Sequence, residues 1–338
     1  MATMTKLLGR IFSSLLLIVG VDPAFAITIN DDAGVSLAID AGIPFSGVAE
    51  LRFANSGGGY GLCSGALVSA KTIVTAQHCT NGYSASSATA IFDYGGARNN
   101  YRVLHIYNML GYNGNIQTGS DISIIEIDSA VNDINPHRFT NEFIVSEQVR
   151  FVGYGLNGTG SSGHEGTRDG ERWAADNTID AYSVGDNASG SNFLYYADFD
   201  NPVGTANTLQ NFNVTSSSDM LALEGSTAGG DSGGPLFVLR DDEWVIAGVL
   251  SGGLVGGVLP YDSSYGAISF WTGFKSTEAQ SLLTDYGGAQ LYSTSSINPP
   301  RVPEINGRNI PIVFFIIGVL GLALQSRQNS HPNFTTTA

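Results

Sequence analysis

The stretch Gly229-Gly230-Asp231-Ser232-Gly233-Gly234-Pro235 is the most informative part of this 338-residue chain. A serine between paired glycines lies where the backbone turns sharply and where a second molecule can approach closely. The amide groups of Gly230 and Ser232 can then converge on one point and stabilise an oxyanion. A simple glycine-rich turn is the alternative, because the chain holds 43 glycines. A run of specified residues is nevertheless far more specific than an isolated Gly-x-Gly, and it predicts a nucleophilic serine.

A second motif, Thr75-Ala76-Gln77-His78-Cys79, follows the apolar run of residues 66–74. An isolated histidine is more often structural than catalytic. His78, however, comes just after an expected strand and beside a cysteine, where its ring can be held rigidly. A general base must lie within hydrogen-bonding distance of the proton that it removes, so His78 is the candidate base.

Asp121 forms the third motif, because it leads into the alternating segment Ile122-Ser123-Ile124-Ile125-Glu126-Ile127. Alternation of this kind is typical of a half-buried β-strand. The ordinary interpretation of Asp121 is a turn residue at the start of this strand. The alternative is a carboxylate that hydrogen-bonds a histidine ring and fixes its tautomer.

The three motifs occur in the order His, Asp, Ser, and together they resemble the chymotrypsin/trypsin-like serine peptidases over about residues 45–274. The resemblance implies an all-β fold of two antiparallel six-stranded β-barrels with a short C-terminal helix and an active site between the barrels. In the mechanism of this family, Ser232 would be the nucleophile and His78 the general base and later acid. Asp121 would orient the imidazolium, and the N–H groups of Gly230 and Ser232 would form the oxyanion hole.

Two cysteines and a further serine extend the resemblance. Cys63, in Cys63-Ser64-Gly65-Ala66-Leu67-Val68, matches the disulfide partner of the histidine loop, which implies a bond to Cys79. Closing a loop of about sixteen residues adds on the order of 3 kcal/mol in the chain-entropy treatment. Ser251, within Val249-Leu250-Ser251-Gly252-Gly253, matches the serine that the family places beside the catalytic aspartate.

The resemblance also implies a substrate pocket. Ser226, counted back from Ser232, matches the base of the primary pocket, and Gly253 and Gly266 would line its walls next to Ser251. Because this base carries no carboxylate, the pocket does not favour Arg or Lys, and large apolar P1 side chains are expected instead. The triad supplies the nucleophile and the proton transfers, so neither a metal nor an organic cofactor is expected.

The sequence leaves two possibilities for the activation of such an enzyme. No Ile-Val-Gly-Gly activation site precedes the first expected barrel. In many relatives a newly cut N-terminus pairs with the aspartate beside the nucleophile, here Asp231, and a buried unpaired carboxylate is costly. Cleavage after Ala26 would provide Ile27 as a new N-terminus; a different partner for Asp231 is the alternative.

The composition excludes other classes of protein. The chain has 15 basic and 30 acidic side chains, and residues 27–292 alone have 10 and 28. Such an acidic surface repels phosphate backbones, so no nucleic-acid partner is expected, whereas cationic substrates would be attracted at low salt. Two cysteines and five scattered histidines cannot form a zinc cluster of the usual spacing.

Both ends of the chain carry expected targeting signals. Residues 1–26 have a basic start, an apolar run and an Ala-Phe-Ala site, as a cleaved signal peptide does. After a linker at residues 293–309, the uncharged segment 310–324 and the tail 325–338 partly resemble a bacterial PEP-type sorting signal. The segment is short for a membrane-spanning helix, so a buried helix of the folded domain is the alternative to a membrane anchor. These signals predict an exported protein that is periplasmic, secreted or attached to the cell surface.

Residues 27–292 are expected to form the peptidase domain, with one barrel at about residues 45–140 and a second at about 141–275. Short runs of β-branched and aromatic residues recur through it between turn residues, without a convincing helix, which indicates antiparallel sheets. Residues 156–218 are polar and glycine-rich and are interpreted mostly as long surface loops, with strands inside this stretch as the alternative. One amphipathic helix is expected at residues 276–286, before a glycine pair.

Three hypotheses follow. The first is an exported serine endopeptidase that cleaves protein or peptide substrates through an acyl-enzyme on Ser232. The second is an inactive copy of the same fold that serves as a surface binding or adhesion module, and the complete set of His78, Asp121 and Ser232 argues against it. The third is a structural surface protein that matches by chance. It is disfavoured because three ordered motifs and a matching cysteine pair occur together.

Overall fold

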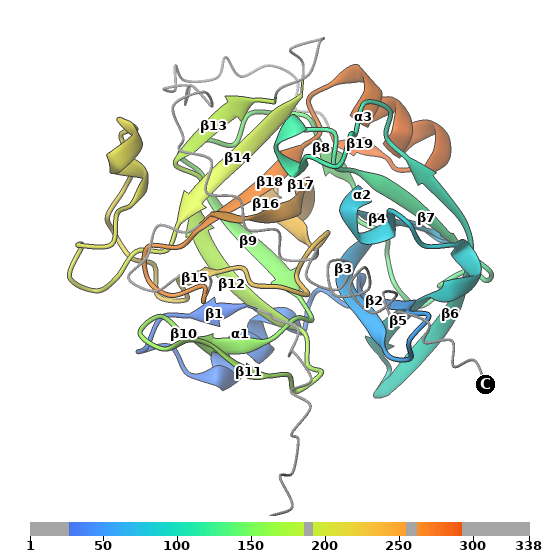
Figure 1. Cartoon of the computed structure of the whole chain (residues 1–338), viewed down its shortest axis with the longest axis horizontal. Helices are drawn as coiled ribbons and strands as arrows, with labels where there is room; N and C mark the ends of the chain where they lie inside the picture. The colour runs from blue at the N-terminus through green and yellow to red at the C-terminus, as the bar shows by residue number, and fades with distance from the viewer. Residues whose placement is uncertain (1–26, 186–191, 255–261, 293–338) are drawn as a thin grey trace, which may run out of the picture.

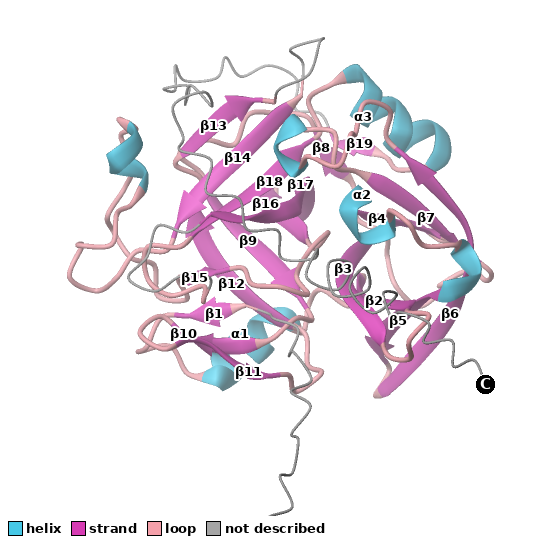
Figure 2. Cartoon of the chain, in the orientation of Figure 1, coloured by secondary structure: helices cyan, strands magenta, loops and turns pink. Residues whose placement is uncertain are grey.

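The computed structural model of the chain describes residues 27–185, 192–254 and 262–292. The expected signal peptide, linker, hydrophobic segment and tail lie outside these residues. Within them, strands predominate and the helices are short, which confirms the all-β prediction (Figure 2). None of the helices in the described ranges combines the length and the apolar content needed to cross a membrane.

The first half of the domain is a closed six-stranded barrel (Figure 1, right). Its strands are β2 (Val48–Ala54), β3 (Tyr60–Ser69), β4 (Thr72–Thr75), β5 (Ala88–Tyr94), β6 (Ala97–Asn108) and β7 (Ser123–Ile127). They follow the hydrogen-bonded order β2-β3-β4-β7-β6-β5. Successive side chains of a strand point to opposite faces, and the inward ones fill the barrel, among them the buried Leu51, Phe53 and Phe92. The closed barrel expected for this half is therefore present.

The second half is built on a nine-stranded sheet (Figure 1, left). Its strands are β8 (Phe139–Thr140), β9 (Gln148–Gly153), β12 (Trp173–Thr178), β13 (Ala181–Val184), β14 (Phe193–Asp198), β16 (Pro235–Arg240), β17 (Glu243–Leu254), β18 (Ile268–Gly273) and β19 (Leu291–Tyr292). The main order is β12-β9-β16-β17-β18-β14-β13, with β8 and β19 to one side. This order is open, although the Asn177 side chain on β12 donates to the carbonyl of Asp198 on β14 at 2.9 Å. The second sheet thus curls toward closure without forming a complete ladder.

A small four-stranded sheet completes the second half. Its strands are β1 (Thr28–Ile29), β10 (Asn157–Thr159), β11 (Gly163–Thr167) and β15 (Gly225–Ser226), in the order β11-β10-β1-β15. Thr28 pairs with Gly158 on one side and with Ser226 on the other. Because β15 leads into the Ser232 turn, this sheet brings the beginning of the domain against that turn.

The structure corrects two expectations from the sequence. Helix α1 (Val35–Gly42) forms where no helix was expected, and it packs on β12. The contact is so close that a Cβ atom on Gly42 would lie 2.2 Å from the Arg172 carbonyl oxygen. Residues 156–218, expected to be mostly loops, contain the strands β10 to β14. These strands are short, so their alternation is too brief to stand out among the surrounding glycines and polar residues.

The expected C-terminal helix is present. Ser276 caps it by accepting a hydrogen bond from the Ala279 N–H at 3.1 Å. Helix α3 (Thr277–Ser281) continues into the π-helical turn η4 (Leu282–Tyr286), and Gly288 follows in the left-handed region with a φ of 60°. The remaining helical turns are α2 (Gln77–Thr80), η1 (Ala85–Ser87), η2 (Ile116–Thr118) and η3 (Leu209–Phe212).

One apolar core joins the two halves. Val74 and Ile124 of the barrel pack in the same cluster as Val152 and Phe237 of the second sheet. All four side chains are buried, and interiors of this kind are close-packed. The halves are therefore held in a fixed relation, which allows residues from both to form one site.

Candidate active site

The strand pairing of the first barrel brings His78 and Asp121 together. Strands β4 and β7 are antiparallel, with Thr75 opposite Ser123. The chain reaches His78 just after leaving β4 and passes Asp121 just before entering β7, so both residues lie at the same edge of the barrel. His78 Nδ1 lies 2.7 Å from Asp121 Oδ2, and the His78 backbone N–H donates to Asp121 Oδ1 at 2.7 Å. These two contacts fix the orientation of the imidazole ring.

The pair combines a buried carboxylate with a partly accessible ring. Asp121 is fully buried, whereas the His78 side chain is 17% exposed. Burial and the nearby Asp121 charge raise the pKa of the Tyr112 phenol above its ordinary range, so this neighbour stays protonated at neutral pH. No sequence motif pointed to Tyr112. The hydroxyl of Ser251, expected beside the aspartate, forms a hydrogen bond with Thr272 at 2.7 Å.

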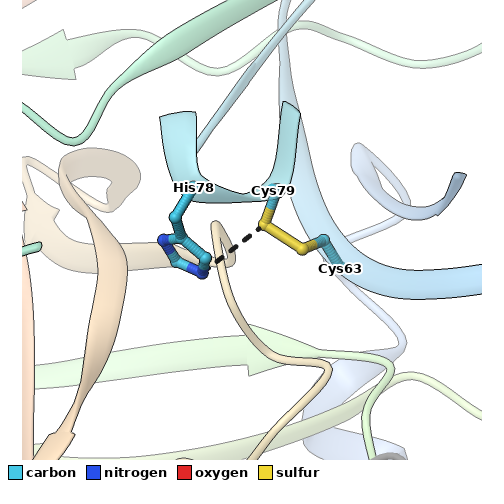
Figure 3. Close-up of side chains that lie close together, drawn as sticks. All are labelled: Cys63, His78 and Cys79. Atoms are coloured by element: carbon cyan, nitrogen blue, oxygen red, sulfur yellow. Dashed lines mark hydrogen bonds between the residues drawn. A yellow bond between two sulfur atoms is a disulfide. The ribbon is translucent and has the colours of Figure 1, made fainter. Parts of the chain in front are cut away.

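The predicted disulfide between Cys63 and Cys79 is confirmed, with Cα atoms 6.2 Å apart. It ties strand β3 to α2, the helical turn that carries His78 (Figure 3). His78 Nε2 lies 3.8 Å from Cys79 Sγ, and the same sulfur lies 3.5 Å from the Ser232 carbonyl oxygen. The disulfide therefore contacts both the histidine and the serine residue.

The same three residues also have the spacing of a metal site. The ligand atoms of Cys63, His78 and Cys79 lie within 4.8 Å of one another (Figure 3). A metal ion, however, requires thiolate sulfur, and both sulfur atoms are joined in the disulfide. In this oxidised form the group is a structural support for His78.

Ser64 of the first barrel holds the Ser232 turn from one side. Its backbone N–H donates to the Ser232 carbonyl at 2.8 Å, and its hydroxyl donates to the Gly230 carbonyl at 3.0 Å. Ser64 is itself fully buried. No motif in the sequence pointed to this role, although Ser64 stands within the cysteine motif. Two hydrogen bonds to the same turn make it a positioning residue for the Ser232 turn.

The second sheet holds the same turn from the other side. The Gly233 N–H donates to the Leu250 carbonyl at 2.8 Å. Gly233 has a φ of 76°, and a Cβ atom there would lie 2.0 Å from the Thr75 hydroxyl oxygen. Both the left-handed backbone and the close contact require glycine. The glycines that drew attention in the sequence are thus needed for the shape of the turn.

Two amide groups beside the Ser232 side chain have the properties of an oxyanion hole. In the described part of the chain, neither the Gly230 N–H nor the Ser232 N–H has an acceptor within the protein. Gly230 has a φ of 94°. Unpaired donors at a preorganised turn can stabilise negative charge on a substrate oxygen. The Ser232 hydroxyl itself makes no hydrogen bond to His78 among the described residues.

Asp231, next to the candidate nucleophile, is buried, and in the described ranges its hydrogen-bond donors are backbone amides only. The Ala228 N–H donates to Oδ2 at 3.1 Å and the Gly155 N–H to Oδ1 at 3.2 Å. Burial raises the pKa of Asp231 to about 7, and these two donors only partly offset that effect. Strand β1 begins at Thr28, which pairs with Ser226, so the buried Ile27 lies next to the segment that leads to Ala228. Among the described residues, Asp231 is therefore paired with two amide groups, which is the alternative to pairing with a new N-terminus. Ile27 lies nearby in the fold.

Two of the four expected pocket residues, Ser226 and Gly253, meet at Ser269. The Ser226 hydroxyl lies 3.1 Å from the Ser269 hydroxyl. Gly253 on β17 pairs with Ser269 on β18. Gly266 precedes β18 with a φ of 86°. The polar groups gathered at Ser226 are neutral hydroxyls, including that of Thr227, 2.7 Å from Ser269.

Comparison with known proteins establishes the class. A family model described as Trypsin matches residues 46–263. Since this match covers well over half of the chain, the protein belongs to the trypsin family of serine peptidases. These are hydrolases that act on protein or peptide substrates. A search of curated proteins found no match.

Proposed function

We propose that the protein is an exported serine endopeptidase that hydrolyses peptide bonds through an acyl-enzyme on Ser232. The observation that carries this proposal is the two-point contact between Asp121 and His78, at 2.7 Å each, beside the rigid Ser232 turn. A base oriented in this way is the arrangement that serine nucleophiles require. Family membership alone would not support catalytic activity, because an inactive relative can keep the fold.

The residues would share the reaction as follows. His78 accepts the Ser232 proton while the serine oxygen attacks the substrate carbonyl, and Asp121 stabilises the imidazolium that forms. The N–H groups of Gly230 and Ser232 donate to the oxyanion. His78 then gives its proton to the leaving amine, and water releases the acyl group by the same steps. The Ser232–His78 hydrogen bond forms when substrate orders the site, as apo enzymes often require.

The substrate preference that we propose follows from the pocket base. Ser226, Thr227 and Ser269 offer hydroxyls there and no carboxylate. A cationic side chain would gain no ion pair at that base and would lose its hydration. Apolar P1 side chains such as Phe, Tyr or Leu lose nothing comparable, so cleavage after these residues is expected.

Activation would occur by removal of residues 1–26. The new ammonium group of Ile27 would then lie near Thr227 and Ala228, close to the buried Asp231 carboxylate. An ion pair with this ammonium would lower the pKa of Asp231 and stabilise the nucleophile turn. Export would follow from the same segment, and residues 310–324 would provide an attachment to the membrane or a sorting signal.

A second candidate is an inactive member of the family that acts as a surface binding module. The observation that favours it is the lack of a Ser232–His78 hydrogen bond within the described residues. An inactive module would fold and form the disulfide but would not turn over substrate. Activity therefore distinguishes the two candidates.

The test uses a protein that spans residues 27–300 and a matched Ser232→Ala variant. Both are offered casein and peptides that end in Phe, Leu or Arg. The wild type is expected to cleave casein and to prefer Phe or Leu over Arg, while the variant is inactive. Equal cleavage by both proteins would exclude Ser232 as the nucleophile. A preference for Arg would exclude the pocket assignment and leave the triad untouched.

A further inference from the structure

Four carboxylates are buried together in the second half of the domain, and none of them belongs to the candidate triad. Each is at most 6% exposed. One precedes β13, one ends β14, and two lie near the ends of the connection of residues 199–224. The short helix η3 of this connection lies at the outer edge of the domain (Figure 1, far left). We refer to them as the acidic cluster: Asp180, Asp198, Asp200 and Glu224.

Within the part of the chain that the structure describes, the acidic cluster has no cationic partner. The carboxyl groups of Asp180 and Asp198 lie within hydrogen-bonding reach of each other. Burial, and then the neighbouring carboxylates, raise the pKa of Asp180 to about 8, that of Asp200 to about 7 and that of Glu224 to about 9. Among the described residues, none of the four forms an ion pair with Lys, Arg or His.

Two oxygen atoms of the acidic cluster point to a missing ligand. Asp198 Oδ1 and Asp200 Oδ1 are buried and have no hydrogen-bond partner in the described part of the chain. Asp198 is fully buried and Asp200 is 4% exposed. Buried polar groups are nearly always paired, and each exception calls for an explanation such as an ion. A proton shared by Asp180 and Asp198 would leave Asp200 without a partner, whereas a divalent cation would neutralise charge across the cluster.

The acidic cluster also organises the connection 199–224. The Leu209 N–H donates to Asp198 Oδ2 at 2.8 Å, and the Ser217 N–H donates to Asp180 Oδ1 at 3.0 Å. The connection is thus attached to the sheet through the same carboxylates that lack a counter-charge. Whatever neutralises these carboxylates will also stabilise the connection.

We propose that the acidic cluster binds one calcium ion, which fastens the connection 199–224 to the second sheet. Asp180 and Asp198 are the direct carboxylate ligands, and Asp200 and Glu224 add negative charge beside them. A site with only oxygen donors suits calcium or magnesium rather than zinc. Calcium accepts six to eight oxygens in irregular geometry, while magnesium requires a near-ideal octahedron. With two direct carboxylates, the other ligands would be backbone carbonyls and water, a mixed set that suits calcium better than magnesium.

The test uses the full chain with Ser232→Ala, so that self-cleavage cannot contribute and the result is independent of the proposed activity. After removal of metals with EDTA, equilibrium dialysis against CaCl2 is expected to show one bound calcium per chain. Millimolar CaCl2 is expected to raise the Tm by about 5 °C or more, as ligand binding to the native state does. MgCl2 and NaCl of equal ionic strength should give smaller shifts.

Matched variants locate the site. In the same background, Asp180→Asn and Asp198→Asn should each lose the bound calcium and the Tm shift, whereas Asp219→Asn, an exposed acidic residue of the same connection, should keep both. If the first two do not fold, Glu224→Gln should weaken calcium affinity at least tenfold. The proposal is overturned if the unsubstituted cluster binds no calcium in dialysis. It is also overturned if calcium binding survives Asp198→Asn, or if Glu224→Gln leaves the affinity unchanged.

Discussion

The two halves of the domain treat buried carboxylates in opposite ways. Glu50 in the first barrel is fully buried, and Arg52, Arg98 and Arg168 all form ion pairs with it. Burial alone would raise the pKa of Glu50, but the hydrogen bond from Arg52 and the charges of Arg168 and Arg98 outweigh it, so that the pKa lies below its ordinary value. The acidic cluster in the second half has no such cation, and its pKa values are raised.

The same contrast holds at the candidate active site. Asp121, contributed by the first half, faces a histidine that can carry a positive charge. Asp231, contributed by the second half, has only the amide groups of Ala228 and Gly155. The buried carboxylates of the first half therefore meet cationic or ionisable partners, Arg168 of the second half included. Among the described residues, Asp231 and the acidic cluster have no such partner. The proposed partners are a calcium ion for the acidic cluster and a new N-terminus for Asp231.

The largest effect is expected for Asp121→Asn. The amide cannot stabilise an imidazolium and favours the wrong histidine tautomer, so kcat should fall by about 10⁴, as for the same change in the family's reference enzyme. The measurement is peptide hydrolysis at saturating substrate, with circular dichroism to show that the fold is kept. Glu126→Gln, on the strand that follows, is the control and should retain activity. Equal losses of activity in both variants would contradict a specific role of Asp121 in orienting His78.

The next effect concerns stability. Glu50→Gln leaves three arginines around an uncharged side chain, which should lower the free energy of unfolding by about 3 kcal/mol. Asp198→Asn in EDTA, by contrast, removes a buried repulsion and should leave stability unchanged or raised. Urea denaturation of both variants and of the wild type provides the comparison. The exposed pair of Arg102 and Asp128 offers a control, since Asp128→Asn should have little effect. A large loss of unfolding free energy in Asp198→Asn without calcium would contradict the proposed difference between the buried carboxylates of the two halves.

A smaller, pH-dependent effect is expected for Asp231→Asn. The folded pKa of about 7 lies above the unfolded value, so the native state binds the proton more tightly. This contribution to stability is complete below about pH 4 and is lost as the pH rises through 7, by about 4 kcal/mol at most. In a full chain that retains residues 1–26, the wild type should therefore lose stability relative to Asp231→Asn over this range.

The matching measurement uses a chain that begins at Ile27. If its ammonium pairs with Asp231, the folded pKa falls and the difference between wild type and variant should no longer decline with pH. Thermal unfolding at pH 4, 6 and 8 tests both chains. Identical pH profiles for the two chains would contradict the proposed role of the new N-terminus.

The parts that could be predicted from the sequence are those encoded in local motifs. The residues around His78, Asp121 and Ser232 are each contiguous, and the Cys63–Cys79 disulfide followed from the same resemblance. The helix at residues 276–286 was also predictable, because a serine cap and a glycine stop frame it.

The remaining features depend on contacts between distant segments. Helix α1 is short and is stabilised by close packing on β12, and no local pattern encodes that contact. Ser64 acquires its role only when the barrel meets the Ser232 turn. The members of the acidic cluster lie up to dozens of residues apart in the chain, and each resembles an ordinary surface aspartate or glutamate until the sheet brings them together.

The central claim is that Ser232 is an activated nucleophile, and covalent labelling tests it most directly. A chain that begins at Ile27 is treated with a fluorophosphonate probe, beside matched Ser232→Ala and His78→Ala variants, and intact mass and peptide mapping locate the adduct. The account predicts one adduct on Ser232 in the wild type, none on residue 232 in Ser232→Ala and strongly slowed labelling in His78→Ala. A folded wild type that remains unlabelled, both before and after limited proteolysis, would contradict it.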